Sequence, residues 1–180
     1  ALGAILAMPA PAADLAASTL IGAVRTYTTH EDDTLLDVAR ASGLGYTEIV
    51  VANPDVDPWL PGEGTEVVLP TGHLLPDGAR EGILINLGDH RLYFFSDQGR
   101  TVLSYPIGVG REGWHTPLGH TTIVRKQKNP TWYPPPAVLA EQPDLPKAVP
   151  PGPDNPLGGH AMYLGFQSFL LHGTNRPWGV

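Results

Sequence analysis

Proline and glycine set the strongest limit on what this chain can fold into. The 180 residues include 20 prolines and 21 glycines, nearly a quarter of the chain, against about 12% in an average protein. No collagen-like period relates them, and proline cannot donate a hydrogen bond to a sheet. The composition therefore predicts a mainly β fold of short strands joined by many turns and rigid loops.

Charge and cysteine content exclude several classes of function. The chain carries 11 Lys and Arg against 18 Asp and Glu, a net charge of −7, so it lacks the basic surface of a nucleic-acid-binding protein. It contains no cysteine, which excludes disulfides, thiolate metal sites and thiol catalysis by these residues. With 42% hydrophobic residues, it has enough apolar side chains to avoid disorder.

The first residues are typical of the tail of a secretory signal peptide. An apolar run at 2–8 is followed by alanines and prolines, and it is shorter than the roughly 20 residues that span a bilayer. We therefore predict a signal-peptide remnant at 1–14 and an exported, periplasmic protein without a membrane span in its mature form. The alternative is an Ala/Pro-rich tail.

Residues 24–70 have the pattern of a small βααβ unit. Strands are expected at 24–28 and 65–69, because β-branched residues are frequent there. Helices are expected at 34–40 and 47–52, which lie between the strands. The unit is close to the lower size limit for independent folding.

The predicted helices have recognisable ends. The helix at 34–40 carries one apolar face, and Asp32 or Asp33 before it would supply the N-cap acceptor. Gly43 tolerates the left-handed conformation that ends a helix. Asn53, followed by proline, is interpreted as the turn that stops the second helix.

The chain from residue 81 onward predicts antiparallel β structure without substantial helix. Strands are expected at 83–87, 91–95, 101–107 and 121–126, with glycine-containing turns between the first three. The proline-dense stretch at 129–156 cannot supply ladder N–H groups, and we predict a long ordered loop or lid. Trp132 and Tyr133 within it would be packing anchors or a wall of a substrate site.

His172 is the strongest candidate for acid–base chemistry. It follows the apolar run 169–171 and precedes Gly173, which predicts an imidazole held rigidly at the end of a buried strand. Histidine titrates near neutral pH and can act as a general base. A purely structural histidine is the alternative at this point.

A zinc site is a weaker possibility. His115 and His120 flank a turn, and with His172 they could form the centre of a zinc hydrolase. No HExxH motif is present and no carboxylate lies between the first two histidines, so we predict no metal.

Two regions resemble known families. Residues 80–180 are similar to the L,D-transpeptidase (YkuD) family, and 24–70 resemble a divergent LysM module. The first resemblance rests on 83–95, 105–110, 116–119, 129–132, 149–158 and 171–175. The second rests on 33–35, 53–54, 61–62 and 67–70, although Asp32 replaces the usual glycine.

The resemblance implies a fold and an activity. An antiparallel β-sandwich catalytic domain would follow the LysM module. A cysteine would attack the third residue of a peptidoglycan tetrapeptide stem, with His172 as the base and Gly173 contributing through its backbone. Trp132, Tyr163 and Thr174 would line the substrate cleft. No metal or nucleotide cofactor is implied, and the partners would be stem peptides, glycan and, in one subgroup, an outer-membrane lipoprotein.

The family's nucleophile is not among these residues. Its signature continues after His-Gly to Ser-x-Gly-Cys, which is expected shortly past Val180. We therefore expect the chain to be truncated before that motif, with a catalytic domain incomplete at its C-terminus, and to be inactive as printed. The alternative is a non-catalytic protein that binds peptidoglycan through its LysM-like module.

Overall fold

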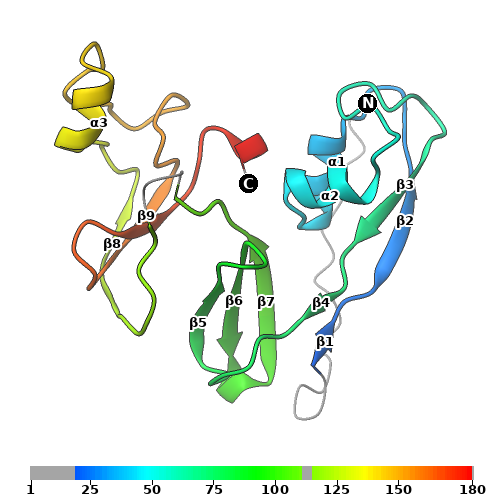
Figure 1. The fold of residues 1–180 in the computed structure, drawn as a ribbon, viewed down its shortest axis with the longest axis horizontal. Coiled ribbons are helices and arrows are strands. Elements are labelled where there is room, and N and C mark those ends of the chain that lie inside the picture. The colour runs from blue at the N-terminus through cyan, green and yellow to red at the C-terminus, as the bar shows by residue number, and fades with distance from the viewer. Residues whose placement is uncertain (1–18, 111–114, 180) are drawn as a thin grey trace. The chain divides into compact units, whose positions relative to one another are not determined.

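The computed structural model describes residues 19–110 and 115–179, and the protein is mainly β with antiparallel strand pairs throughout these ranges (Figure 1). It forms two compact units: the first comprises the chain up to Val109 together with the C-terminal residues from Trp178, and the second spans Gly110–Pro177. The predicted signal-peptide remnant at 1–14 lies outside the described residues. None of the helices in the described part has the length and hydropathy to cross a membrane.

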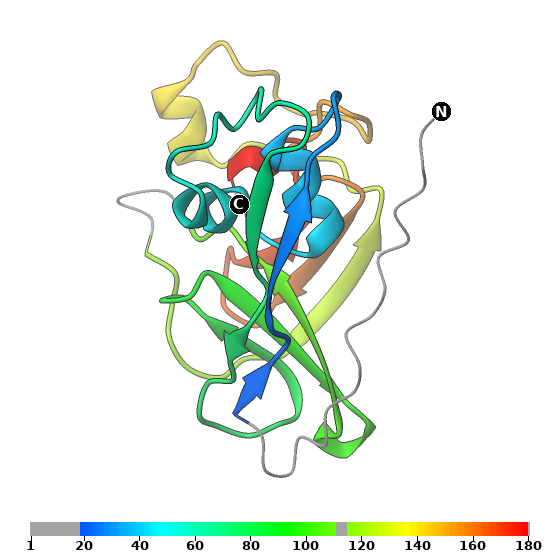
Figure 2. The same cartoon turned by 90° about the vertical axis from the view of Figure 1, so that its right-hand side faces the viewer.

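The βααβ order predicted for 24–70 is present. Strand β2 (Val24–Thr28) pairs with β3 (Glu66–Pro70), and the two run side by side in Figures 1 and 2. Between them lie helices α1 (Leu35–Ser42) and α2 (Tyr46–Ala52). The LysM resemblance and the domain boundaries stay predictions.

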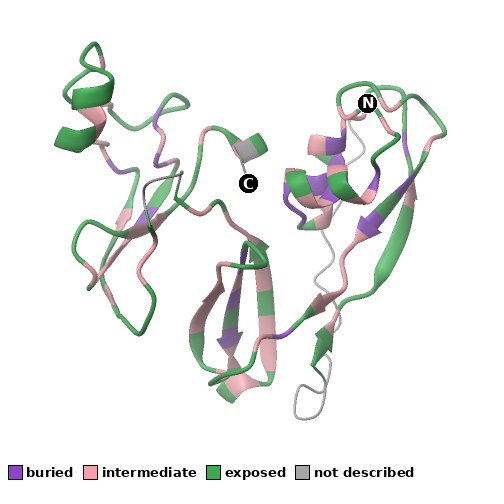
Figure 3. Ribbon diagram, viewed as in Figure 1, coloured by how far each residue is buried: buried purple, intermediate pink, exposed green. Residues whose placement is uncertain are grey.

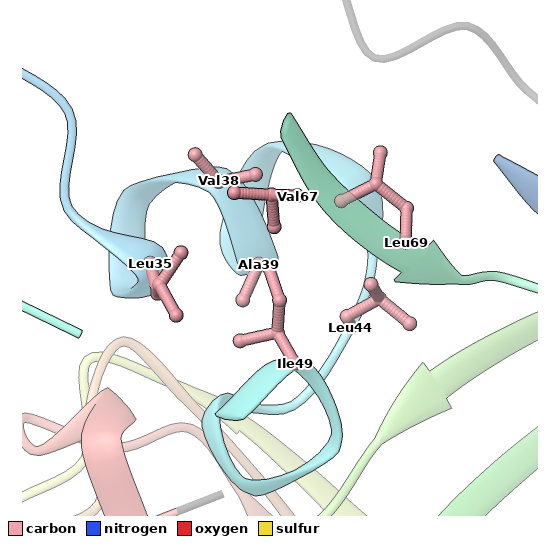
Figure 4. Packing of buried hydrophobic residues seen from close by; sticks show 7 residues of the cluster. All are labelled: Leu35, Val38, Ala39, Leu44, Ile49, Val67 and Leu69. Atoms are coloured by element: carbon pink, nitrogen blue, oxygen red, sulfur yellow. The ribbon is translucent and has the colours of Figure 1, made fainter. Parts of the chain in front are cut away.

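A closed apolar core holds these elements together. Its members come from α1, α2, β3 and the α1–α2 connection, and Figure 4 shows them packed between the helices and the strand. Figure 3 marks buried segments of these elements in purple. The core residues are Leu35, Val38, Ala39, Leu44, Ile49, Val67 and Leu69, all less than 9% exposed. Alternate residues of β3 point inward, which is the period of two that a half-buried strand requires.

The helix ends correct one prediction and confirm two. The N-cap of α1 is Thr34, not Asp32 or Asp33, because the Thr34 hydroxyl accepts the Asp37 N–H at 3.1 Å. Gly43 does end α1, with φ of 68°. Asn53 ends α2.

The Asn53 side chain also joins α2 to β3. This side chain is buried, and its Nδ2 donates to the carbonyls of Ile49 and Val68 at 2.8 and 2.9 Å. Its Oδ1 accepts the Val68 N–H at 2.7 Å. The residue that stops the helix therefore also fixes the closing strand, which supports the structural interpretation of Asn53.

The rest of the first unit contains two small sheets. Strand β1 (Leu20–Ile21) pairs with β4 (His73–Leu74). Strands β5 (Gly82–Asn86), β6 (Arg91–Ser96) and β7 (Thr101–Pro106) form the predicted meander, with a 3₁₀ turn η1 at Asp97–Gly99.

Arg91, at the start of β6, is a buried cation. It is 2% exposed, and its Nη1 lies 2.8 Å from a carboxylate oxygen of Glu48 on α2. Its Nη2 donates to the Gly43 carbonyl at 3.0 Å, and its Nε donates to the Ser104 hydroxyl at 2.8 Å. These bonds compensate the burial of the charge and tie the meander to both helices.

The second unit contains one three-stranded sheet in the order β10–β9–β8. Its strands are β8 (Ile123–Lys128), β9 (His160–Leu164) and β10 (Leu170–His172). Strand β9 is not among the strands predicted from the sequence.

The proline-dense segment, predicted to be a loop, contains a helix. This helix, α3, spans Pro136–Glu141. Proline in the first turn is tolerated there because no helical acceptor is available for its missing N–H. A final 3₁₀ turn, η2, covers Pro177–Gly179.

Candidate active site

His172 is oriented by the backbone of the next residue. The Nδ1 of its imidazole lies 2.5 Å from the Gly173 carbonyl oxygen. A carbonyl only accepts, so Nδ1 carries the proton and Nε2 keeps a free lone pair. This tautomer is the one that a general base acting through Nε2 requires.

His172 is more exposed than the sequence predicted. Leu170 and Leu171 are half-buried rather than buried, and the His172 side chain is exposed at the end of β10. Among the described residues, β10 is an edge strand of its sheet, with β9 as its hydrogen-bonded neighbour. An exposed imidazole is accessible to a substrate or to a nucleophile placed beside it.

Close backbone contact fixes the turn after His172. The Gly173 N–H donates to the His160 carbonyl at 3.1 Å. Gly158 has φ of 62°, and a Cβ placed there would lie 2.9 Å from the Thr174 nitrogen. Only glycine fits at position 158 without displacing the backbone that carries the Gly173 carbonyl.

A cavity of about 340 Å³ lies beside this turn. The loop before β9 and the residues after Gly173 form its walls, together with Asn129. Its lining residues are Asn129, Gly152, Pro153, Asn155, Gly158, Gly159, Thr174 and Asn175.

Asn155 holds the proline-dense segment in place. It is fully buried, and its Nδ2 lies 2.8 to 3.1 Å from the carbonyls of Pro130, Val149 and Pro150. Its Oδ1 accepts the Leu157 N–H at 2.9 Å. Prolines have no N–H, so a side-chain amide is needed to satisfy the carbonyls that this segment buries.

Asn155 is not among the site residues predicted from the sequence. The available signal is a carboxamide between the prolines at 153 and 156, in a stretch with few backbone donors. Such a residue is suited to bonding the carbonyls around it.

The predicted substrate-contacting residues are distributed over three places. Thr174 lines the cavity, and its hydroxyl accepts the Arg176 N–H at 2.9 Å. Trp132 lies outside the cavity lining and exchanges two backbone hydrogen bonds of 2.9 and 2.8 Å with Val149. Tyr163 lies on β9, with the guanidinium carbon of Arg125 3.6 Å from its ring centroid.

The described residues do not assemble a metal-binding cluster. Within 19–110 and 115–179, no three His, Cys, Asp or Glu side chains are close enough to hold an ion. His115 and His120 are both exposed. The zinc-hydrolase hypothesis therefore has no support from the geometry of the described part.

Comparison with known proteins identifies the family. The YkuD profile, described as the L,D-transpeptidase catalytic domain, matches residues 80–180. Two proteins of Escherichia coli (strain K12) are similar over most of this chain. The probable L,D-transpeptidase ErfK/SrfK is 39% identical, over 91% of this chain and 54% of that protein. The probable L,D-transpeptidase YbiS is 40% identical, over 91% of this chain and 55% of that protein.

A solved structure from Brucella melitensis, described as a probable carnitine operon oxidoreductase, is 31% identical and covers 58% of this chain and 70% of its own, with a TM-score of 0.47. The chain spans about half the length of the curated relatives it matches. Because the family profile covers more than half of the chain, the chain belongs to the L,D-transpeptidase (YkuD) family.

Proposed function

We propose that the protein is a peptidoglycan L,D-transpeptidase. It would form an acyl-enzyme with the third residue of a tetrapeptide stem and transfer that acyl group to an amine. The observation that carries the proposal is the Nδ1 contact of His172 with the Gly173 carbonyl, which frees Nε2 to accept a proton.

The reaction would proceed in two acyl transfers. His172 Nε2 takes the proton of a cysteine thiol, and the sulfur attacks the stem carbonyl, so a C–S bond forms. The C–N bond to the terminal D-Ala breaks, and His172 returns the proton to the leaving amine. An acceptor amine then attacks the thioester carbonyl and gives a proton to His172. A C–N bond forms, the C–S bond breaks, and His172 passes the proton to the leaving thiolate.

The nucleophile must come from outside these residues. The 180 residues contain no cysteine, so the proposal requires the Ser-x-Gly-Cys motif in addition to the residues printed here. The chain alone would bind stems without cleaving them. The Gly173 carbonyl and the 158–174 backbone contact would orient the base toward that thiol.

The cellular context belongs to the same proposal. The acceptor would be the amine of a second stem or of an outer-membrane lipoprotein, and the enzyme would act in the periplasm. Residues 24–70 would bind the glycan and hold the enzyme on its substrate, as the LysM resemblance implies. Thr174 would contact the stem in the cavity, and Trp132 and Tyr163 would contribute further walls.

Removal of the base tests the activity. In the protein that carries the cysteine motif, His172→Ala should slow D-Ala release from a soluble tetrapeptide stem by about 10²- to 10⁴-fold. His120→Ala, which removes another exposed histidine, is the matched control and should leave the rate within about twofold. An unchanged rate of D-Ala release in the His172 variant would show that His172 is not the general base.

A second candidate function rests on the βααβ unit at 24–70, which resembles a LysM module. The protein could bind peptidoglycan through 24–70 without catalysis. Sacculus binding without D-Ala release, by the protein that includes all residues translated after Val180, would support this alternative. D-Ala release that depends on His172 would exclude it.

A further inference from the structure

The three-stranded sheet of the second unit aligns a polar cluster with His172. Across the strands, His172 pairs with Ala161, which pairs with Gln127. In the next row of the same face, Tyr163 pairs with Arg125. Directly opposite residues of antiparallel strands, and residues two apart on one strand, project from the same face. Arg125, Gln127 and Tyr163 therefore share the face of His172.

The guanidinium of Arg125 is held in place by its neighbours. Its Cζ lies 3.6 Å from the Tyr163 ring centroid, and its Nη1 donates to Gln127 Oε1 at 2.7 Å. The Tyr163 hydroxyl donates to the same oxygen at 3.4 Å. Stacking and hydrogen bonding restrict a side chain that is otherwise flexible, which reduces the entropy lost on binding an anion.

No carboxylate of the described residues pairs with Arg125. The two ion pairs within these residues join His30 to Asp33 and Arg91 to Glu48. Arg125 is exposed, although acidic residues outnumber basic ones by 18 to 11 in the chain. A fixed, exposed cation without an internal counter-charge is suited to an anionic ligand.

The spacing fits a short peptide. Neighbouring strands lie about 4.8 Å apart and two residues along a strand span about 7 Å, so the His172 and Arg125 backbones are separated by about 12 Å. An extended peptide covers about 3.3 to 3.6 Å per residue. Three to four residues therefore bridge the two positions.

We propose that Arg125, supported by Tyr163 and Gln127, is a recognition site for a carboxylate of the donor stem peptide. The inference rests on the proposed function, because it takes the stem as the ligand that reaches His172. The guanidinium offers N–H groups other than the one bonded to Gln127, and two of them can bond both oxygens of a carboxylate.

Binding of a soluble tetrapeptide stem to the printed chain tests this site without catalysis. Arg125→Gln should raise the dissociation constant by about tenfold or more, as expected for the loss of a charged hydrogen-bond donor. Lys126→Gln is the matched control, since it removes the same charge from the neighbouring exposed residue on the opposite face. It should change the affinity by less than about twofold.

Stems amidated at one carboxylate at a time identify the group recognised. The wild-type chain should lose affinity for one amidated stem, and the Arg125→Gln variant should bind that stem as well as the unmodified one. Equal binding by wild type and Arg125→Gln, or an equal loss in Lys126→Gln, would overturn the proposal. An unchanged backbone amide spectrum of each variant shows that the sheet is intact.

Kinetics separate this inference from the proposed function. In the protein that carries the cysteine motif, Arg125→Gln should raise KM about tenfold and leave kcat nearly unchanged, because binding and not proton transfer is lost. If wild type releases no D-Ala, the proposed function fails while the binding comparison still decides on Arg125. A fall in kcat at constant KM would contradict the recognition role.

Discussion

The βααβ region and the sheet of the second unit are held together in different ways. Seven apolar side chains close the core between α1, α2 and β3. Both apolar clusters of the described residues lie in the first unit. In the second unit the buried apolar side chains Leu157 and Ala161 accompany a fully buried carboxamide, Asn155, that bonds four backbone groups.

The difference matters for function. Hydrophobic contact is non-directional and stabilises a shape, whereas hydrogen bonds fix the direction of particular backbone groups. The candidate site needs directional hydrogen bonds, because the Gly173 carbonyl must point at Nδ1 of His172. Substitutions in the two regions should therefore differ in what they change: overall stability in the first, and local order beside His172 in the second.

The largest expected loss of stability comes from a charge left without its partner. Glu48→Ala leaves the buried Arg91 cation uncompensated and should lower the free energy of unfolding by about 4 kcal/mol. Arg91→Met replaces the cation with an apolar side chain and should lower the free energy of unfolding by less than Glu48→Ala does. Urea denaturation gives the free energy of unfolding of both variants. A larger loss in Arg91→Met than in Glu48→Ala would show that the buried Arg91 cation does not require the Glu48 carboxylate.

Truncation within the apolar core comes next. Ile49 is fully buried on α2, and Ile49→Ala should cost about 3 kcal/mol by lost burial and a residual cavity. Val51→Ala on the same helix is the control, because Val51 is 72% exposed, and it should cost less than about 0.5 kcal/mol. Similar losses in the free energy of unfolding for Ile49→Ala and Val51→Ala would show that Ile49 is not packed in a closed core.

Loss of the Asn155 carboxamide should have a local effect. Asn155→Ala leaves buried carbonyls and the Leu157 N–H without partners and should cost about 2 kcal/mol. Faster hydrogen exchange at the Leu157 amide is the specific readout. Asn175→Ala removes one bond to the Asp154 carbonyl and is the matched control, with little expected change at Leu157.

The smallest expected effect is a pH dependence at the start of the βααβ region. Burial, and then the hydrogen bond to Asp33, raise the pKa of Tyr27 to about 12 from its ordinary value of 10.0. A raised folded-state pKa stabilises the protein below pH 10, and this contribution is lost as the pH rises to about 12.

Asp33 gives the opposite dependence. Burial would raise the pKa of Asp33, but hydrogen bonds from the His30 N–H and the Tyr27 hydroxyl outweigh it and lower that pKa below 3.8. Its contribution is present above that value and is lost as the pH falls through the lowered pKa. Tyr27→Phe should lower the free energy of unfolding by about 1 kcal/mol at pH 7. It should also reduce the alkaline loss, while the raised pKa of buried Tyr93 leaves a part of that loss in place. An alkaline loss equal to that of wild type would refute the assignment to Tyr27.

Local signals explain why much of the first unit could be predicted. The apolar face of α1, the stop at Gly43 and the alternation in β3 each follow from residues adjacent in sequence. The N-cap was predicted incorrectly because Asp33 turns to Tyr27 and His30 instead of the helix, and this depends on residues that only the fold brings together.

The second unit could be predicted less completely. Strand β9 lies between glycines that predict turns, and α3 follows three consecutive prolines that predict a loop. Histidine chemistry and the family resemblance identified His172 and Gly173 as candidates. The roles of Asn155 and Arg125 depend on burial and on strand register, which a single sequence does not provide.

The tautomer of His172 tests the central claim most directly. Nitrogen NMR of the imidazole in the printed chain, at alkaline pH where histidine is neutral, distinguishes a proton on Nδ1 from one on Nε2. The contact with the Gly173 carbonyl predicts a protonated Nδ1 and an unprotonated Nε2. A protonated Nε2 would show that Gly173 does not orient His172, and the proposed base would then be in the wrong form to act.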